Sequence, residues 1–99
     1  MSDAVAVVWD EALAAYDFGP GHPLAPIRVQ LAMRLAADFG LLDRLDVLTP
    51  VTPATMAEIL AVHDPDYVDA VKRASADPRE VDVARGIGTP DDPSFAGMH

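Results

Sequence analysis

Apolar residues gather in short runs along the first half of the chain. The run Ala4–Trp9 is rich in valine and ends at Asp10 and Glu11, a pattern that predicts a buried strand. Because the run is continuous rather than alternating, it is typical of a parallel sheet covered on both faces. A second apolar run, Leu45–Leu48, predicts another short strand. Between them, Tyr16–Pro26 is interrupted by two glycines and three prolines and predicts a loop.

The clearest helix expected from the pattern is Ile27–Phe39. Its apolar residues recur every four positions, which places them on one helical face; they are Ile27, Leu31, Leu35 and Phe39. Pro26 suits the first turn of this helix, and Gly40 suits the position just after its end. Arg28 lies near the positive end of the helix dipole, so it does not serve local helix stability. Either it extends to solvent, which the local sequence favours, or it points into a pocket and meets carbonyls or an anion.

Two further helices are expected in the second half of the chain. Thr52 predicts the N-cap of a helix that Pro53 opens, with apolar residues at Met56, Ile59 and Leu60. Asp64 predicts the next N-cap, with Pro65 at the first helical position and Asp66 in the first turn. The apolar side of that helix would carry Tyr67, Val68 and Val71. From Ser75 onward, repeated glycine and proline predict mostly loop.

These elements predict the α/β class but do not complete a layered structure. Parallel strands need crossover partners, and a few helices with a long terminal loop do not supply them. We therefore expect residues 1–99 to be the N-terminal fragment of a larger domain, with no further domain boundary inside it.

Composition narrows the class of protein. The chain has 7 basic and 16 acidic residues, a net charge of −9, which argues against partners such as nucleic acid or an anionic membrane. The absence of cysteine excludes disulfide scaffolds and cysteine zinc sites. The start of the chain lacks the basic region and cleavage site of a signal peptide. We expect a soluble, cytoplasmic protein.

Few residues qualify as candidates for chemistry. His22 lies in a Gly-Pro-Gly-His-Pro loop, where it either lines a pocket or, as the spacing favours, stabilises a tight turn. His63 and His99 are too far from it in sequence to form a helical metal pair. Asp91 and Asp92 lie between two prolines and would bind a cation or backbone amides, or form a solvated turn. No complete catalytic set is present.

Several stretches together resemble the N-terminal part of the zinc-dependent histone deacetylase family, in the order found there. They are Tyr16–Pro23, Pro26–Arg28, Phe39–Leu41, His63–Val68 and Gly86–Gly88 leading into Asp91–Phe95. The Gly-His-Pro-x-x-Pro-x-Arg run is the most specific of them. The ending Phe95–His99 is most similar to the bacterial acetoin utilization proteins.

The resemblance implies an arginase-like fold, a parallel sheet between helical layers, and hydrolysis of acetyl-lysine to lysine and acetate. It implies that the full-length enzyme contains zinc, held by residues absent from this chain. This chain would then contain no catalytic residue and would have no activity alone. Arg28 matches an arginine of the internal cavity associated with acetate exit. Asp91, or less well Asp92, matches an aspartate that accepts hydrogen bonds from substrate amides. Gly21, His22 and Pro23 would form part of the active-site wall.

Two alternatives to an acetyl-lysine deacetylase remain at this point. One is a deacetylase of acetylpolyamines or other small acetylated amines. The other is a non-catalytic acidic α/β interaction module, which explains the missing catalytic set but not the family-ordered motifs.

Overall fold

A computed structural model describes residues 4–99. The chain divides into two compact units, one ending at Thr52 and one running from Pro53 to His99. Each unit is described by itself below.

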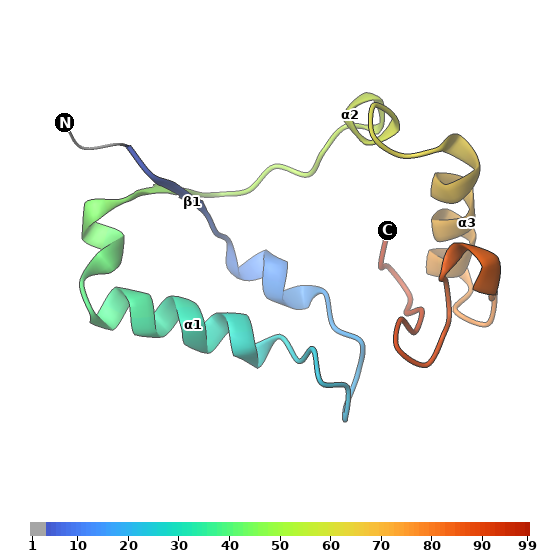
Figure 1. Cartoon of the computed structure of the whole chain (residues 1–99), viewed down its shortest axis with the longest axis horizontal. Helices are drawn as coiled ribbons and strands as arrows, with labels where there is room; N and C mark the ends of the chain where they lie inside the picture. The colour runs from blue at the N-terminus through green and yellow to red at the C-terminus, as the bar shows by residue number, and fades with distance from the viewer. Residues whose placement is uncertain (1–3) are drawn as a thin grey trace. The chain divides into compact units, whose positions relative to one another are not determined.

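The first unit is a strand–helix–strand arrangement (Figure 1). Its elements are β1 (Ala6–Val8), the 3-10 helix η1 (Glu11–Ala15), α1 (Ile27–Asp38), the 3-10 helix η2 (Leu41–Arg44) and β2 (Asp46–Leu48). The two strands are parallel, with Val7 opposite Val47. Both expected strands and their parallel direction are therefore confirmed, and Tyr16–Pro26 is a loop as predicted.

The prediction that the first strand is buried is wrong for this unit. Only Val7 of β1 is half-buried, while Val8 is 56% exposed. The sheet formed by the described residues has two strands, and the central residue of each strand, Val7 and Val47, is only half-buried. A continuous apolar run is typical of a strand that is buried on both faces, and the first unit by itself does not bury β1 in this way.

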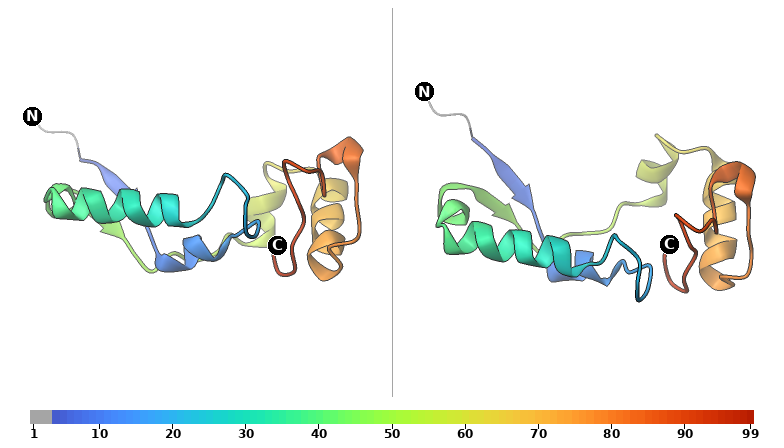
Figure 2. Two further views of the ribbon diagram at one scale, coloured as in Figure 1. Left: turned by 90° about the horizontal axis from the view of Figure 1, so that it is seen from below. Right: turned by 60° about the horizontal axis from the view of Figure 1, so that its bottom comes forward.

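Helix α1 confirms the predicted helix almost residue for residue. Pro26 stands at its N-cap and Gly40 follows its end with φ of +73°, the left-handed conformation that glycine adopts most easily. The helix contacts η1 and η2 (Figure 2). Gln30 contributes to the contact with η1, because its amide Nε2 donates to Glu11 Oε2 at 3.2 Å.

The second unit begins with α2 (Met56–Leu60), which starts later than predicted. Its N-cap is Thr55, not Thr52, and Pro53 lies outside the helix. Thr55 Oγ1 accepts from the Glu58 backbone N–H, and Glu58 Oε1 accepts from the Thr55 backbone N–H. This reciprocal pair satisfies two amides at the helix start, an arrangement that Thr52 has no acidic partner to form.

Helix α3 (Pro65–Ala76) carries the core of the second unit. Asp64 is its N-cap and Pro65 its first residue, as predicted. The buried apolar side chains among the described residues are Val68, Ala70, Ala74 and Ile87. The predicted apolar side is confirmed at Val68, which is buried; Val71 is partly buried against the core and Tyr67 is 37% exposed.

The chain after α3 is mostly loop, as expected, apart from the short 3-10 helix η3 (Val83–Arg85). Asp82 and Ile87 form an isolated antiparallel bridge around η3 that brings Ile87 into the core. The terminal residues then return to α3, where the Gly97 N–H donates to the Ser75 carbonyl and Met98 packs on the core. None of the helices within residues 4–99 has the length and apolar character that crossing a membrane requires.

Candidate functional site

The Gly-Pro-Gly-His-Pro loop is a turn that His22 helps to hold. The His22 Nδ1 atom accepts from the Leu24 backbone N–H at 3.1 Å. Its ring lies 4.5 Å from the ring of Phe18, centroid to centroid. Asp17 Oδ1 accepts from the Gly19 N–H at 2.9 Å and fixes the start of the loop. The interpretation of His22 as a turn residue is thus the one that the contacts support, and its Nδ1 lone pair is already engaged.

Arg28 lies at an open groove where the loop joins α1. The groove has a volume of about 430 Å³. Its walls come from η1, the loop and the first turns of α1; they are Leu13, Tyr16, Leu24, Ala25, Pro26, Arg28, Val29 and Ala32. Arg28 is exposed, and within residues 4–99 it forms no ion pair. The exposed side chain agrees with the alternative that the local sequence favoured, and Arg28 is also among the residues that border a largely apolar groove.

Gly21 lies at a second groove on the other side of the same junction. This groove has a volume of about 540 Å³, and Asp17, Gly21 and Gln30 are among its lining residues. Ala25 and Pro26 border both grooves. His22 and Pro23 line neither of them. The structure therefore places Arg28 and the loop at one junction, where Arg28 and Gly21 line different grooves.

Asp91 and Asp92 belong to the second unit. Both are exposed. The Asp92 N–H donates to Thr89 Oγ1 at 3.1 Å, and its carbonyl accepts from the Gly88 N–H at 3.0 Å. Gly88 has φ of +77°, which glycine adopts most easily, and a Cβ atom there would lie 3.1 Å from Val81 Cγ2, so a larger residue would be strained. The loop is an ordered turn that presents two carboxylates.

The chain is 38% identical over 101 residues to the acetoin utilization protein AcuC of Bacillus subtilis, covering all of this chain and 26% of that protein. It is 33% identical over 76 residues to histone deacetylase clr6 of Schizosaccharomyces pombe, covering 77% of this chain and 18% of that protein. It is 30% identical over 99 residues to histone deacetylase RPD3 of Saccharomyces cerevisiae, covering 96% of this chain and 22% of that protein.

The chain belongs to the histone deacetylase family. It is of the AcuC type and spans about a quarter, or less, of the length of these relatives. No protein-family model and no solved structure matches it.

Family membership raises the question of zinc, and the residues present do not fit a zinc site. No group of three histidine, cysteine, aspartate or glutamate side chains converges within residues 4–99. His22 uses Nδ1 in the turn, and the ring of His63 lies 5.6 Å from that of Tyr67 on α3. His99 is joined to Ser75 through its backbone N–H. No zinc-dependent step is therefore assigned to these side chains.

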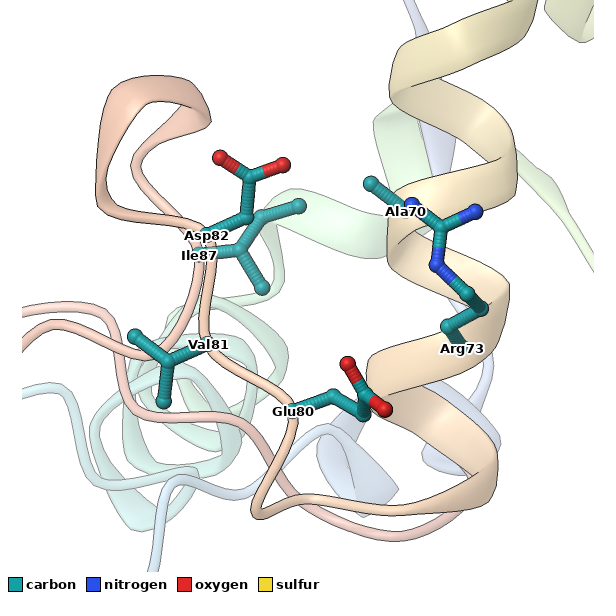
Figure 3. A pocket seen from close by; sticks show the side chains of 6 residues that line it. All are labelled: Ala70, Arg73, Glu80, Val81, Asp82 and Ile87. Atoms are coloured by element: carbon teal, nitrogen blue, oxygen red, sulfur yellow. The ribbon is translucent and has the colours of Figure 1, made fainter.

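The second unit contains a small polar cavity that the sequence motifs did not predict. It lies between α3 and the segment from Glu80 to Ile87; Glu80 points toward α3, whereas Arg73 extends along the helix (Figure 3). Asp82 also borders it, and its side chain pairs with Arg85 at 2.7 Å. The cavity volume is about 60 Å³, room for about two waters but not for an acetyl-lysine side chain. It is therefore no substrate pocket.

Asp10 was also missed as a structural residue. Its Oδ1 accepts from the Ala12 N–H at 3.0 Å, and its Oδ2 accepts from the Val51 N–H at 3.1 Å. These two hydrogen bonds, above all the one from Ala12, lower the pKa of the Asp10 carboxyl. The sequence signal was present, since an acidic residue directly after a strand often accepts neighbouring amides.

Proposed function

We propose that this chain contributes the N-terminal segment of a zinc-dependent deacetylase that hydrolyses acetyl-lysine to lysine and acetate. The observation that carries the proposal is the 38% identity to AcuC along the whole chain. Residues 1–99 would form one part of a single arginase-like domain. The parallel pairing of β1 and β2 supports such a sheet.

Arg28 is proposed to bind the acetate product. A guanidinium binds a carboxylate through two parallel hydrogen bonds, and it stays charged at any working pH. Arg28 supports this role because it has no anionic partner within residues 4–99 and borders a largely apolar groove. Gly21, His22 and Pro23 would then shape the wall beside it.

Asp91 is proposed to hold the substrate backbone, with Asp92 as the second choice. A carboxylate only accepts hydrogen bonds, which suits peptide N–H donors. The turn around Gly88 supports the role, because both aspartates are exposed residues of an ordered loop.

The zinc and the general base of the full enzyme are proposed to come from residues outside these 99. The enzyme is proposed to be cytoplasmic. Acetyl-lysine protein is the preferred substrate class, and acetylpolyamines or other small acetylated amines are the alternative. A non-catalytic interaction module is the remaining alternative.

A chimera tests the proposal directly. The 99-residue chain replaces the matched segment of Bacillus subtilis AcuC, and acetate release is measured from an acetyl-lysine peptide and from an acetylpolyamine. We expect turnover of the peptide at a rate near that of the parent protein. A folded chimera without turnover, beside an active parent, would contradict the proposal, and preference for the polyamine would select the alternative substrate.

Arg28→Ala in this chimera should lower kcat by about 10- to 100-fold, the loss expected for a charge-assisted contact. Arg34→Ala is the matched control, since Arg34 lies on α1 but borders a different groove. Equal effects of the two substitutions would argue against an acetate site at Arg28.

A parallel pair of variants separates the two aspartates. Asp91→Ala should raise KM for the peptide several-fold with a smaller effect on kcat, because it removes substrate binding remote from the bond that breaks. Asp92→Ala should leave KM unchanged. The reverse result would transfer the role to Asp92.

A further inference from the structure

The turn that carries Asp91 is held by the side chain of Thr89. Thr89 Oγ1 accepts from the Asp92 backbone N–H at 3.1 Å, so the hydrogen bond closes the turn from its first residue to its fourth. Threonine and serine hydroxyls commonly stabilise turns by bonding to nearby backbone groups in this way. Pro90, the second residue of the turn, has a ring that restricts φ to about −65°. The backbone on both sides of Asp91 therefore has little freedom.

The end of the turn is tied to the core of the second unit. The Asp92 carbonyl accepts from the Gly88 N–H at 3.0 Å, so both backbone polar groups of Asp92 are hydrogen-bonded. Gly88 directly follows Ile87, which is buried in the core at 6% exposure. Asp91 is exposed and comes immediately before this anchored residue. An exposed carboxylate is thus carried on a backbone that is connected to the core within a few residues.

We propose that Thr89 is a positioning residue that orients the Asp91 carboxylate toward the backbone amides of the substrate. A hydrogen bond weakens steeply when its angle departs from linearity, so the direction of the Asp91 side chain affects how well it accepts from peptide N–H groups. Thr89 fixes that direction through the backbone of the turn and does not itself contact the substrate. The inference rests on the proposed role of Asp91 in substrate binding.

A second hydroxyl close to the turn does not hold it. Ser94 Oγ lies 3.5 Å from the position that a Cβ atom on Gly88 would occupy. It is buried and forms no hydrogen bond within residues 4–99, so its removal would leave both hydrogen bonds of the turn in place. Thr89 and Ser94 therefore form a matched pair, in which a hydroxyl that holds the turn is compared with a nearby hydroxyl that does not.

Thr89→Val in the AcuC chimera tests the proposal, because valine keeps the shape of threonine and removes Oγ1. The substitution should raise KM for the acetyl-lysine peptide by about 3- to 10-fold, the range that the net contribution of one hydrogen bond predicts, and should leave kcat nearly unchanged. Thr89→Ser keeps the acceptor and should hold KM within about twofold of the unsubstituted chimera. Ser94→Ala is the control and should leave KM unchanged.

A double-mutant cycle distinguishes positioning from a general structural effect. If Thr89 acts through the Asp91 carboxylate, then Thr89→Val should raise KM in the unsubstituted chimera but should have no further effect once Asp91→Ala has removed that carboxylate. A structural effect of Thr89 that does not pass through Asp91 would instead raise KM by the same factor in both backgrounds.

Peptide binding supplies a readout that does not depend on turnover. The Kd of a fluorescein-labelled acetyl-lysine peptide is measured by anisotropy with the chelator-treated chimera, and the effects of the variants on Kd should follow those on KM. Hydrogen exchange at the Asp92 amide should be faster in Thr89→Val, because that N–H has lost its acceptor. The urea midpoint should stay the same, because Thr89 lies outside the buried core.

Three results would overturn the proposal. One is a KM that Asp91→Ala raises and Thr89→Val does not, in an active chimera, which would leave the proposed function intact. Another is equal loss in Thr89→Ser and Thr89→Val, and the third is an equal effect of Thr89→Val with and without the Asp91 carboxylate. A folded chimera that binds the peptide with the expected pattern of Kd values but releases no acetate would support the role of Thr89 and contradict the proposed deacetylase activity.

Discussion

Single acidic side chains stabilise the turns of this protein by accepting backbone amides. Asp10 joins the end of β1 to Val51, which is 41 residues away. Asp64 and Asp82 cap α3 and η3 in the same way. Part of the net charge of −9 thus has a local structural use, which the sequence predicted for Asp64 but not for Asp10 or Asp82.

Asp10→Ala should loosen the first unit at Val51. The substitution removes the acceptor of the Val51 N–H, so hydrogen exchange at that amide should become about tenfold faster. Asp10→Asn should have a smaller effect, because its single carbonyl oxygen replaces one of the two acceptors. Asp43→Ala, on the exposed surface of η2, is the control, and equal exchange rates at Val51 in all variants would contradict the role.

The pH dependence of the second unit should reflect Asp82. The hydrogen bond from the Arg85 side chain holds the pKa of Asp82 below its ordinary value of 3.8. A carboxyl whose pKa is lowered by folding adds stability above its unfolded pKa, and that stability is lost as the pH falls through the folded pKa. Stability from this group should therefore be constant from pH 7 to about 5 and decline below about pH 4.

Asp82→Asn tests this assignment. The variant should be less stable than the wild type at pH 6 and should lose less stability on acidification, so the two urea midpoints should converge at low pH. NMR titration of the Asp82 carboxyl checks the direction of its pKa shift. Parallel midpoint curves for the two proteins would refute the assignment.

In the helices, local chemistry determines where a helix begins, and packing determines where the helix lies. The capping box of α2 is local, and so it forms wherever Thr and Glu stand three residues apart at a helix start. The position of α1 against η1 depends on residues distant in the sequence, such as Gln30, whose side-chain amide donates to Glu11.

Thr55→Ala should weaken α2 by about 1 kcal/mol, the usual cost of losing an N-cap. Hydrogen exchange of the Glu58 amide, whose N–H donates to Thr55 Oγ1, should speed up accordingly. Thr52→Ala is the matched control and should leave that amide unchanged. An effect of Thr52→Ala equal to that of Thr55→Ala would restore the helix start at Thr52.

Among the described residues, few apolar side chains are buried. The core residues among those described are small, with Ala70 and Ala74 beside Ile87 and Val68. Many larger apolar side chains are exposed, Leu35 and Phe39 among them. Such a chain exposes more apolar surface than a stable small domain normally does.

The isolated 99-residue chain should bind the hydrophobic dye ANS and should show no acetate release from an acetyl-lysine peptide. The first result follows from the exposed apolar surface, and the second from the absence of a converging ligand set within residues 4–99. Fluorescence titration and an acetate assay measure them. Chelator-sensitive deacetylation by the purified chain would contradict the second expectation.

Much of the candidate site was predictable because its signals are local. The Gly-His-Pro loop, the start of α1 after Pro26 and the cap at Asp64 follow from backbone preferences of a few adjacent residues. The prediction of an N-cap at Thr52 was wrong for a local reason too, because the Glu58 side chain accepts from the Thr55 backbone N–H.

The sequence by itself determined the helices α1 and α3, the parallel strands and the family, because periodicity, caps and motif order depend on neighbouring residues. Only the tertiary structure decided which apolar positions are buried. Ile87 enters the core because the bridge to Asp82 folds a distant segment onto α3, whereas the equally apolar Leu31 stays in solvent. Burial depends on which segments meet, and periodicity alone does not specify that meeting.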